Sequence, residues 1–197
     1  MSIFAKITDS GEPIYVSYFA QPPHNMENLI PLPCEPEDLG AFLYKTYWKK
    51  GEWRTRGERP SEFFIWDLLS ESWLPNLDAA KAAKKTEIET ELSRRLYLPC
   101  NGFDADNVSR ERISGMIARL QRGDGLPAGW MGWRDAENAY RWADDDAETV
   151  LANLTALSRA IEDREQALLV ASWAHKANIA ALEDIDAILA YDTTTAW

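Results

Sequence analysis

Four residues in the motif GWMGWRDAENAYRW, which spans residues 129–142, could form a binding surface. Trp130 and Trp133 each offer a flat apolar face and one N–H donor. Asp135 can accept hydrogen bonds, and Asn138 can both donate and accept them. Such a set suits contact with a glycan or with another protein, so these four are the candidate binding residues. For Trp133, as for Phe103 and Tyr191, a place in the hydrophobic core is the preferred interpretation, and a binding role is the alternative.

Residue types that support catalysis or metal binding are not arranged for either role. The two histidines, His24 and His175, have no Cys, Asp or Glu partner at the spacing of metal ligands. The motifs of nucleophilic hydrolases and of nucleotide-binding loops do not occur in the sequence. The acids Asp144–Asp146 fit the start of a helix, where the helix dipole favours negative charge. We therefore expect no catalytic residue, no metal and no cofactor, and we expect that the chain is not an enzyme.

The composition predicts a folded, acidic protein. Of 197 residues, 46% are hydrophobic and 11% aromatic, which suffices for a packed core. The net charge of −11 argues against a nucleic-acid partner, because phosphate binding needs a clustered basic surface. Lys81, Lys84 and Lys85 are followed by Glu87, Glu89 and Glu91, which predicts a solvated helix face with pairs such as Lys85–Glu89. Without a cofactor motif, a small-molecule ligand is not expected either.

The cysteines and the length of the apolar runs indicate the cellular compartment in which the chain folds and whether a membrane is a partner. Cys34 and Cys100 lie far apart, and no signal peptide occupies residues 1–10, so we expect unpaired thiols in a reducing compartment. No apolar run approaches the roughly 20 residues that a membrane-spanning helix needs. A membrane partner is therefore not expected.

The first 76 residues predict an aromatic-rich antiparallel β unit. Alternating residues on both sides of Asp9-Ser10-Gly11 indicate a hairpin, and two further hairpins are predicted over residues 42–56 and 61–75. Five prolines within residues 21–36 predict an extended surface loop or, alternatively, a docking strip for a partner. The tryptophans of this unit are expected to form one compact core, with an exposed carbohydrate platform as the alternative. These tryptophans are Trp48, Trp53, Trp66 and Trp73.

Helical periodicity dominates the rest of the chain. Helices are predicted over residues 77–96, 108–121, 146–180 and 183–190, with a β-hairpin within residues 129–142. The first helix has sparse apolar positions, which is typical of a semi-exposed connector or of one strand of an oligomeric bundle. The long helix carries an apolar stripe, which we expect to pack on helix 108–121 and the hairpin. A seam with a partner chain is the alternative.

The predicted fold class is therefore α+β. A small N-terminal antiparallel β unit with a proline-rich loop occupies residues 1–76, and a connector helix occupies residues 77–97. A mostly α-helical domain that contains one β-hairpin occupies residues 98–197.

Two segments resemble phage proteins. The hairpin F-x-W-D…W, here Phe64 to Trp73, leads into a Lys/Ala/Glu helix that ends in arginines. This is similar to the linker of small tail-fibre assembly proteins of tailed phages. Residues 94–192 resemble a domain of unknown function that recurs in phage tail-fibre and tail-tip proteins. The residues that carry this second resemblance are Gly102, Phe103, Asp104, Ser109, Arg110, Ile113, Gly115, Trp133, Asp135, Asn138, His175, Ile179 and Tyr191.

The resemblance implies a non-enzymatic structural component of a tailed-phage tail, in the tail fibre, tail tip or baseplate, that acts through protein–protein contacts. The implied partners are other tail or fibre proteins and further copies of the same chain, as a homo-oligomer. The implied location is the virion tail, after synthesis in the cytoplasm of the bacterial host. The alternative is a tail-fibre assembly chaperone, which binds the fibre tip and leaves before the particle matures. A third hypothesis is an enzyme or a receptor-sugar binder that uses Trp130–Asn138.

Overall fold

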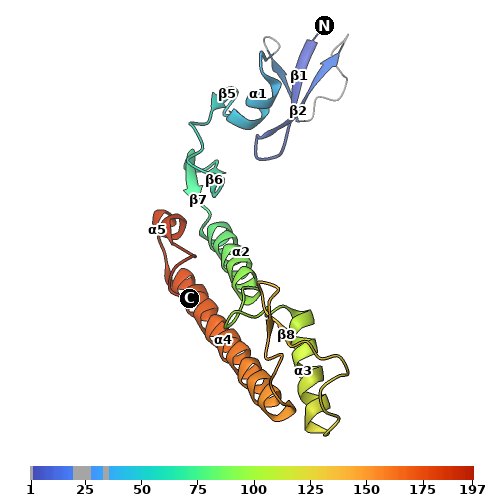
Figure 1. Cartoon of the computed structure of the whole chain (residues 1–197). Coiled ribbons are helices and arrows are strands. Elements are labelled where there is room, and N and C mark those ends of the chain that lie inside the picture. Colours follow the sequence, from blue (N-terminus) through green and yellow to red (C-terminus); the bar gives the residue numbers. More distant parts are fainter. Residues whose placement is uncertain (1, 20–27, 33–35) are drawn as a thin grey trace. The chain divides into compact units, whose positions relative to one another are not determined.

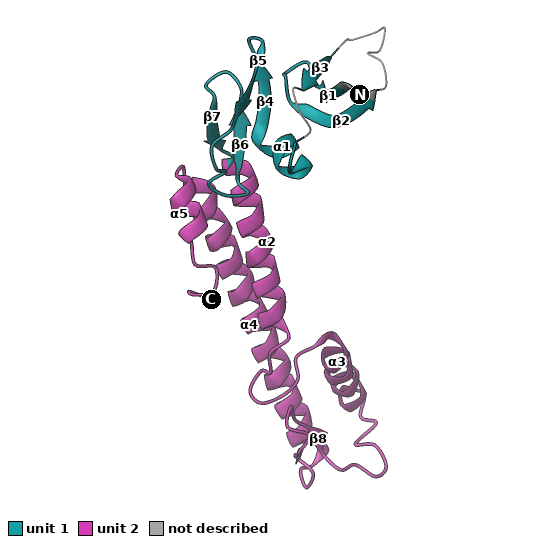
Figure 2. Cartoon of the chain, turned by 90° about the horizontal axis from the view of Figure 1, so that it is seen from above, with its two compact units in different colours: residues 1–76 teal, residues 77–197 magenta. Residues whose placement is uncertain are grey.

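The computed structural model describes residues 2–19, 28–32 and 36–197. It has the predicted α+β fold, in which antiparallel strands are followed by helices and a small hairpin (Figure 1). Two compact units divide the chain, residues 1–76 and residues 77–197 (Figure 2). Several residues that enter the sequence predictions lie outside the described residues, namely Pro22, Pro23, His24, Pro33 and Cys34.

The first unit begins with a three-stranded antiparallel sheet. β1 (Ser2–Ile7) pairs with β2 (Pro13–Phe19), as the alternating residues predict. β3 (Leu29–Leu32) pairs with the other side of β1, which gives the strand order β2-β1-β3. The prediction of a loop throughout residues 21–36 was therefore wrong for β3. Pro31 is tolerated there because β3 is an edge strand, where a missing N–H donor matters little.

A short helix follows this sheet. α1 (Leu39–Lys45) is capped by Asp38, whose carboxylate accepts a backbone N–H of the first turn at 2.9 Å. The strand predicted from residue 42 was therefore wrong over residues 42–45, and β4 (Thr46–Lys49) begins where α1 ends. Aromatic residues in this stretch favour a strand by propensity, but the capped first turn sets a helix instead.

Two separate hairpins complete the first unit. β4 pairs with β5 (Glu52–Thr55), and β6 (Phe64–Asp67) pairs with β7 (Ser72–Pro75). Both hairpins agree with the sequence prediction of two Trp-bearing hairpins in this region.

Tryptophans lie opposite each other across each hairpin. Trp48 faces Trp53 and Trp66 faces Trp73, with ring centroids 5.3 Å apart in both pairs. All four rings are half-buried. The one compact tryptophan core that the sequence predicts is thus replaced by two cross-strand pairs, each belonging to its own two-stranded sheet. Tyr47, whose ring centroid lies 5.3 Å from that of Trp66, is the buried aromatic residue beside them.

The second unit is built around two long antiparallel helices. Its helices are α2 (Leu77–Leu96), α3 (Asn107–Gln121), α4 (Ala147–Ala181) and α5 (Ile185–Ala190). Near the start of α2, Lys81 Nζ donates to the carbonyl oxygen of Ala180 at 2.9 Å. At the end of α2, the carbonyl oxygen of Leu96 accepts from Arg164 Nη2 at 3.2 Å. The two helices therefore run in opposite directions, and α2 packs along α4.

A hydrophobic core joins α3 to the first half of α4. Its buried residues are Cys100, Phe103, Ala105, Ile113, Leu120, Val150, Leu154, Leu157 and Ile161. A small hairpin of β8 (Trp133–Arg134) and β9 (Tyr140–Arg141) covers it, and Trp130, Trp133 and Trp142 pack against the core while half-buried. The first half of the apolar stripe on the long helix therefore packs on α3 and the hairpin, as predicted. The second half, which includes Leu168, lies where α4 packs along α2, so the prediction was wrong there.

Acidic side chains cap three of these helices and pair with basic residues of others. Asp106 caps α3, Asp146 caps α4 and Asp184 caps α5, each by accepting the backbone N–H three residues further on at 2.8 Å. Glu89 pairs with Lys176 of α4 at 3.0 Å rather than with Lys85 as predicted. This difference arises because α2 packs against α4 and offers its glutamates a partner on another helix.

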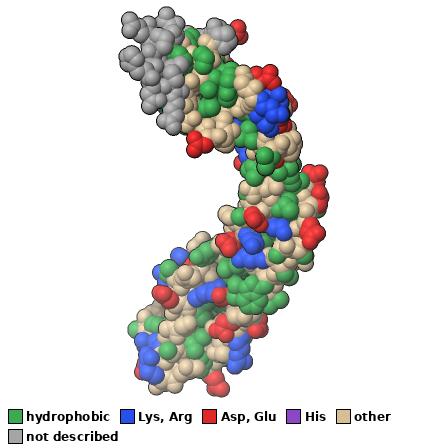
Figure 3. Space-filling view, turned by 180° about the vertical axis from the view of Figure 1, so that it is seen from behind, with side chains coloured by type: hydrophobic (Ala, Val, Ile, Leu, Met, Phe, Trp, Pro, Cys, Tyr) green, Lys and Arg blue, Asp and Glu red, His purple; other side chains and the backbone are tan. Residues whose placement is uncertain are grey.

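The surface of the second unit carries charges of both signs. In the lower part of Figure 3, acidic and basic side chains lie intermingled with hydrophobic ones. Some form ion pairs, for example Glu91 with Arg94 and with Arg95, each at 2.6 Å. None of the helices in the described part of the chain combines the length and the apolar composition of a membrane span.

Candidate functional site

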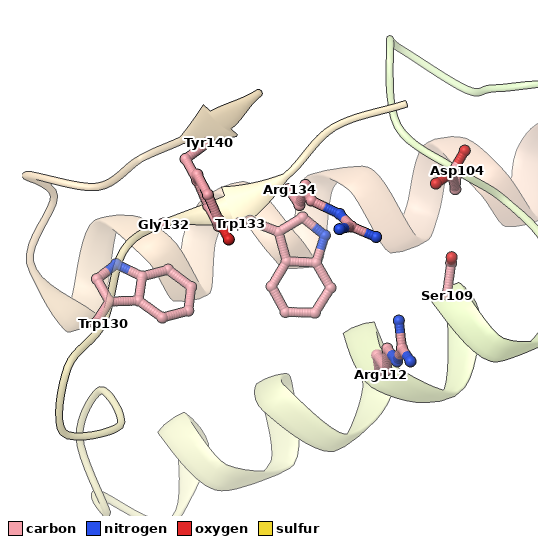
Figure 4. A pocket seen from close by; sticks show the side chains of 8 residues that line it. All are labelled: Asp104, Ser109, Arg112, Trp130, Gly132, Trp133, Arg134 and Tyr140. Carbon is pink, nitrogen blue, oxygen red and sulfur yellow. The ribbon is translucent and has the colours of Figure 1, made fainter. Parts of the chain in front are cut away.

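A hollow of about 390 Å³ opens between the start of α3 and the β8–β9 hairpin (Figure 4). Three segments line it: the turn before α3, the first turns of α3, and the hairpin with the loop that precedes it. The lining residues are Asp104, Ser109, Arg112, Trp130, Gly132, Trp133, Arg134 and Tyr140. Two of the four candidate binding residues, Trp130 and Trp133, are thus among them.

The other two candidates, Asp135 and Asn138, build the turn of the hairpin and do not line the hollow. Asp135 is only 5% exposed, and its Oδ1 accepts the backbone N–H groups of Glu137 at 3.0 Å and Ala139 at 2.8 Å. Asn138 adopts a positive φ of 66°, and its N–H donates to the Asp135 carbonyl oxygen at 3.0 Å. Asp135 therefore stabilises the hairpin turn beside the hollow and does not itself offer its carboxylate to a ligand.

An ion pair completes the support of the hairpin. Arg141 Nε donates to Asp135 Oδ2 at 2.7 Å. This bond, followed by the backbone N–H bonds in the turn, lowers the pKa of the Asp135 carboxyl from its ordinary value, so the group stays ionised at neutral pH. Next to it, the N–H of Ala136 donates to the carbonyl oxygen of Gly102 at 2.9 Å, which ties the hairpin to the turn before α3.

The loop before β8 places the two tryptophans. Gly132 has a φ of 103°, and a Cβ at this position would lie 2.5 Å from the carbonyl oxygen of Arg141. Only glycine lets the backbone pass this closely. Trp130 Nε1 donates to the carbonyl oxygen of Trp142 at 3.1 Å, which fixes its indole beside the core. The indole of Trp133 projects between the hairpin and α3.

The hollow has an aromatic end and a polar end (Figure 4). Tyr140 joins the two tryptophans at the aromatic end, whereas the polar end holds Asp104, Ser109, Arg112 and Arg134. Among the described residues, neither Arg112 nor Arg134 has a hydrogen-bond or ion-pair partner, and both side chains are exposed. Arg110, one turn from the hollow, is by contrast paired with Glu165 of α4. The presence of two free guanidinium groups beside one hollow is therefore a distinguishing feature of this site.

Chemically, this arrangement suits binding. A flat ring can stack on the indole faces, the guanidinium groups can hold an anion, and Asp104 can accept hydrogen bonds from hydroxyl groups. Across the part of the chain that the structure describes, no group of three His, Cys, Asp or Glu side chains could hold a metal ion.

A second hollow, of about 290 Å³, lies beside the C-terminal tail. His175, which is 5% exposed, shares a hydrogen bond of 2.9 Å with the hydroxyl of Tyr191 through Nδ1. Its ring also packs against Trp197, with centroids 5.0 Å apart. These contacts agree with a structural role for this histidine.

Sequence reasoning missed most of the polar end of the first hollow. Ser109 and Arg112 are three residues apart on a predicted helix and so share a face, which was a usable signal. Arg134 and Tyr140 are opposite each other across the hairpin. The sequence does not predict that α3, with Ser109 and Arg112, packs beside the hairpin, with Arg134 and Tyr140.

The comparisons with known proteins give a family and no activity. The family model described as a domain of unknown function (DUF4376) matches residues 79–195, which is more than half of the chain. The chain therefore belongs to this family. The matched segment includes every residue that lines the first hollow. No curated protein matches the chain, and no solved structure does.

Proposed function

We propose that the chain is a non-enzymatic structural component of a tailed-phage tail, in the fibre, tip or baseplate, and that it acts through protein–protein contacts. The sequence resemblance supports the phage assignment, through the F-x-W-D…W hairpin from Phe64 to Trp73 and the helix that follows it. The structural support is an exposed face of α4 that carries large apolar side chains, which we propose is a contact surface for a second copy of the chain.

This contact surface, the outer face of α4, is the observation that carries the proposal. Its residues are Gln166, Val170, Trp173, Ala177 and Ala180, all of them exposed. They follow one another at spacings of four, three, four and three, which is the alternation of a helix that packs against another helix. Trp173 is 61% exposed and Val170 57%, although both side chains are large and apolar. Exposed tryptophan at the centre of such a seam is typical of an interface anchor.

The neighbouring residues of α4 show that this face is distinct from the intramolecular one. Leu168, Ser172 and Ile179 are buried within the unit, on the opposite side of the helix. A second copy could therefore pack on the outer face without disturbing the fold of either chain.

The second candidate function is a tail-fibre assembly chaperone. The net charge of −11 favours it, because a strongly charged assembly factor stays soluble at high concentration. The same face of α4 would then bind a fibre during folding. The two functions differ in whether the chain remains in the finished particle.

Quantitative mass spectrometry of purified particles of the encoding phage, measured against the infected lysate, distinguishes these functions. A tail component is present in particles at a fixed multiple of the tail symmetry. Abundance in the lysate with absence from the particles would contradict the structural role and leave the chaperone.

Multi-angle light scattering tests the contact surface independently. Trp173→Glu should weaken self-association of the chain by at least about tenfold, because it places a charge in the seam. Val108→Glu is the matched control, since Val108 is 55% exposed on α3 of the same unit. A chain that is monomeric at every concentration, or that responds equally to both substitutions, would contradict a self-associating seam.

A further inference from the structure

We infer that the hollow between α3 and the β8–β9 hairpin is a binding site for a carboxylated sugar, of the uronate or sialate class, within an acidic glycan. The inference goes beyond the proposed tail function and does not depend on it. It rests on the side chains that line the hollow and on the way the fold holds them.

The aromatic end provides the surface for a sugar ring. Trp130 and Trp133 pack against the hydrophobic core on one side and line the hollow on the other. The C–H groups of a pyranose face are apolar, so they pack favourably on an indole. Tyr140, 52% exposed at the same end, adds a second aromatic surface and a hydroxyl that can donate or accept a hydrogen bond.

The polar end provides the recognition of an acid. Arg112 comes from α3 and Arg134 from β8, and within the described residues neither guanidinium forms an ion pair or a hydrogen bond. A guanidinium presents N–H donors in a planar fork that matches the two oxygens of a carboxylate. Two such groups at one end of a hollow lined by aromatic rings favour a ligand with a ring and a carboxylate.

The remaining polar side chains favour a sugar over other anions. Asp104 only accepts hydrogen bonds when ionised, so it suits a ligand whose hydroxyl groups donate to it while a single carboxylate binds the arginines. Ser109 adds a hydroxyl to the same end. Recognition of a peptide C-terminus commonly uses successive backbone N–H groups, whereas this site offers side-chain guanidinium groups. The volume of about 390 Å³ lies within the range of small-ligand sites.

The fold holds this site in place without a ligand. The carboxylate of Asp135 fixes the hairpin turn through three hydrogen bonds, and Ala136 bonds to Gly102 beside the polar end. Trp130 is held by its bond to the carbonyl oxygen of Trp142. A preformed site loses little conformational entropy on binding, which favours affinity for a small ligand.

The test is a titration of the full chain with defined oligosaccharides, followed by calorimetry and by the indole N–H signals in NMR spectra. The acidic probes are oligogalacturonate, a glucuronate-containing tetrasaccharide and sialyllactose, and the neutral probes are lactose and methyl-esterified oligogalacturonate. At least one acidic probe should bind at least about tenfold more tightly than the neutral ones, because a charged hydrogen bond is lost without the carboxylate.

Arginine variants test whether the sugar binds in this hollow. Arg112→Gln and Arg134→Gln should each weaken binding by about tenfold, and both should leave folding unchanged because these side chains are exposed and unpaired. Arg159→Gln is the matched control, since Arg159 is also exposed and without a partner among the described residues but lies on α4 away from the hollow.

Three outcomes would overturn the inference. The first is that no acidic probe binds at concentrations up to about 10 mM. The second is that binding falls as much in Arg159→Gln as in the two variants of the hollow. The third is that a peptide with a free C-terminal carboxylate binds more tightly than every sugar, with the same dependence on the arginines, which would make the hollow a peptide site.

Discussion

Arg54 of β5 and Glu71, in the turn between β6 and β7, form an ion pair in which Nη1 lies 2.8 Å from Oε2. The same oxygen accepts the hydroxyl of Tyr47 at 2.9 Å, and Lys49 Nζ lies 2.8 Å from the other oxygen. Glu71 therefore joins two hairpins that share no strand pairing. In the described part of the first unit, the large apolar side chains that are buried are Phe4, Ile7 and Tyr47. This polar cluster is therefore a principal link between the two-stranded sheets of the unit.

We predict that the link between the hairpins weakens in acid. Hydrogen bonds from Lys49, then from Tyr47 and Arg54, lower the pKa of Glu71 from 4.5 to about 2. Because the pKa is depressed in the folded state, its contribution to stability is complete above pH 4.5 and is lost as the pH falls through about 2. Hydrogen exchange of residues 46–75, measured across this pH range, should show the loss.

Glu71→Gln should remove that pH dependence and raise hydrogen exchange in residues 46–75 already at neutral pH. Glu58→Gln is the control, since Glu58 is exposed and without a partner among the described residues. Equal exchange in Glu71→Gln and the unmodified chain would contradict the role of this cluster.

Two glycines of the second unit should respond to alanine in opposite directions. Gly132→Ala places a Cβ 2.5 Å from the Arg141 carbonyl oxygen at a φ of 103°, and strain of this kind costs about 1–3 kcal/mol. Gly115 lies within α3, and a Cβ there meets nothing within 4 Å. Gly115→Ala should therefore stabilise the unit by about 0.5–1 kcal/mol. Urea denaturation of both variants measures the two changes, and a destabilised Gly115→Ala would be inconsistent with this geometry.

The pairing of α2 with α4 should depend on two buried isoleucines. Ile88 of α2 and Ile179 of α4 are both fully buried. Ile88→Ala or Ile179→Ala should lower the free energy of unfolding by about 2–5 kcal/mol, because each leaves a cavity between rigid helices. Val108→Ala, at a position 55% exposed on α3, should change it by no more than about 0.5 kcal/mol. Calorimetry at low protein concentration measures the free energy of unfolding of the three variants. A similar loss in Val108→Ala and in the two isoleucine variants would contradict the assignment of Ile88 and Ile179 to the core.

The helices and hairpins were predictable because their signals are local. The apolar stripe that contains Leu154 and Leu157 identifies the long helix, and acidic residues mark where α3 and α4 begin. The strand β3 was not predictable in the same way, because Pro31 argues against a strand unless the segment pairs at an edge. That pairing depends on β1, more than twenty residues earlier in the chain.

The candidate site was half predictable for a related reason. Trp130 and Trp133 stand out in the sequence by residue type, and both line the hollow. Asp135 stands out equally, but its carboxylate faces the backbone of its own turn, which only the hairpin geometry determines. Arg112 and Arg134 are brought together by the bond between Ala136 and Gly102 and by packing on the core.

The C-terminal residue should stabilise the second unit through its ring. Trp197 packs on His175 of α4, and the Arg95 guanidinium lies 5.4 Å from its ring centroid. Trp197→Ala should therefore lower the melting temperature and increase hydrogen exchange near His175, whereas Trp197→Phe keeps a ring and should retain part of the effect. Thr195→Ala is the control, because Thr195 is exposed in the same tail. If hydrogen exchange around His175 is the same in Trp197→Ala and Thr195→Ala, the tail contact contributes nothing to the stability of α4, and packing on α2 and α3 must hold the helix without it.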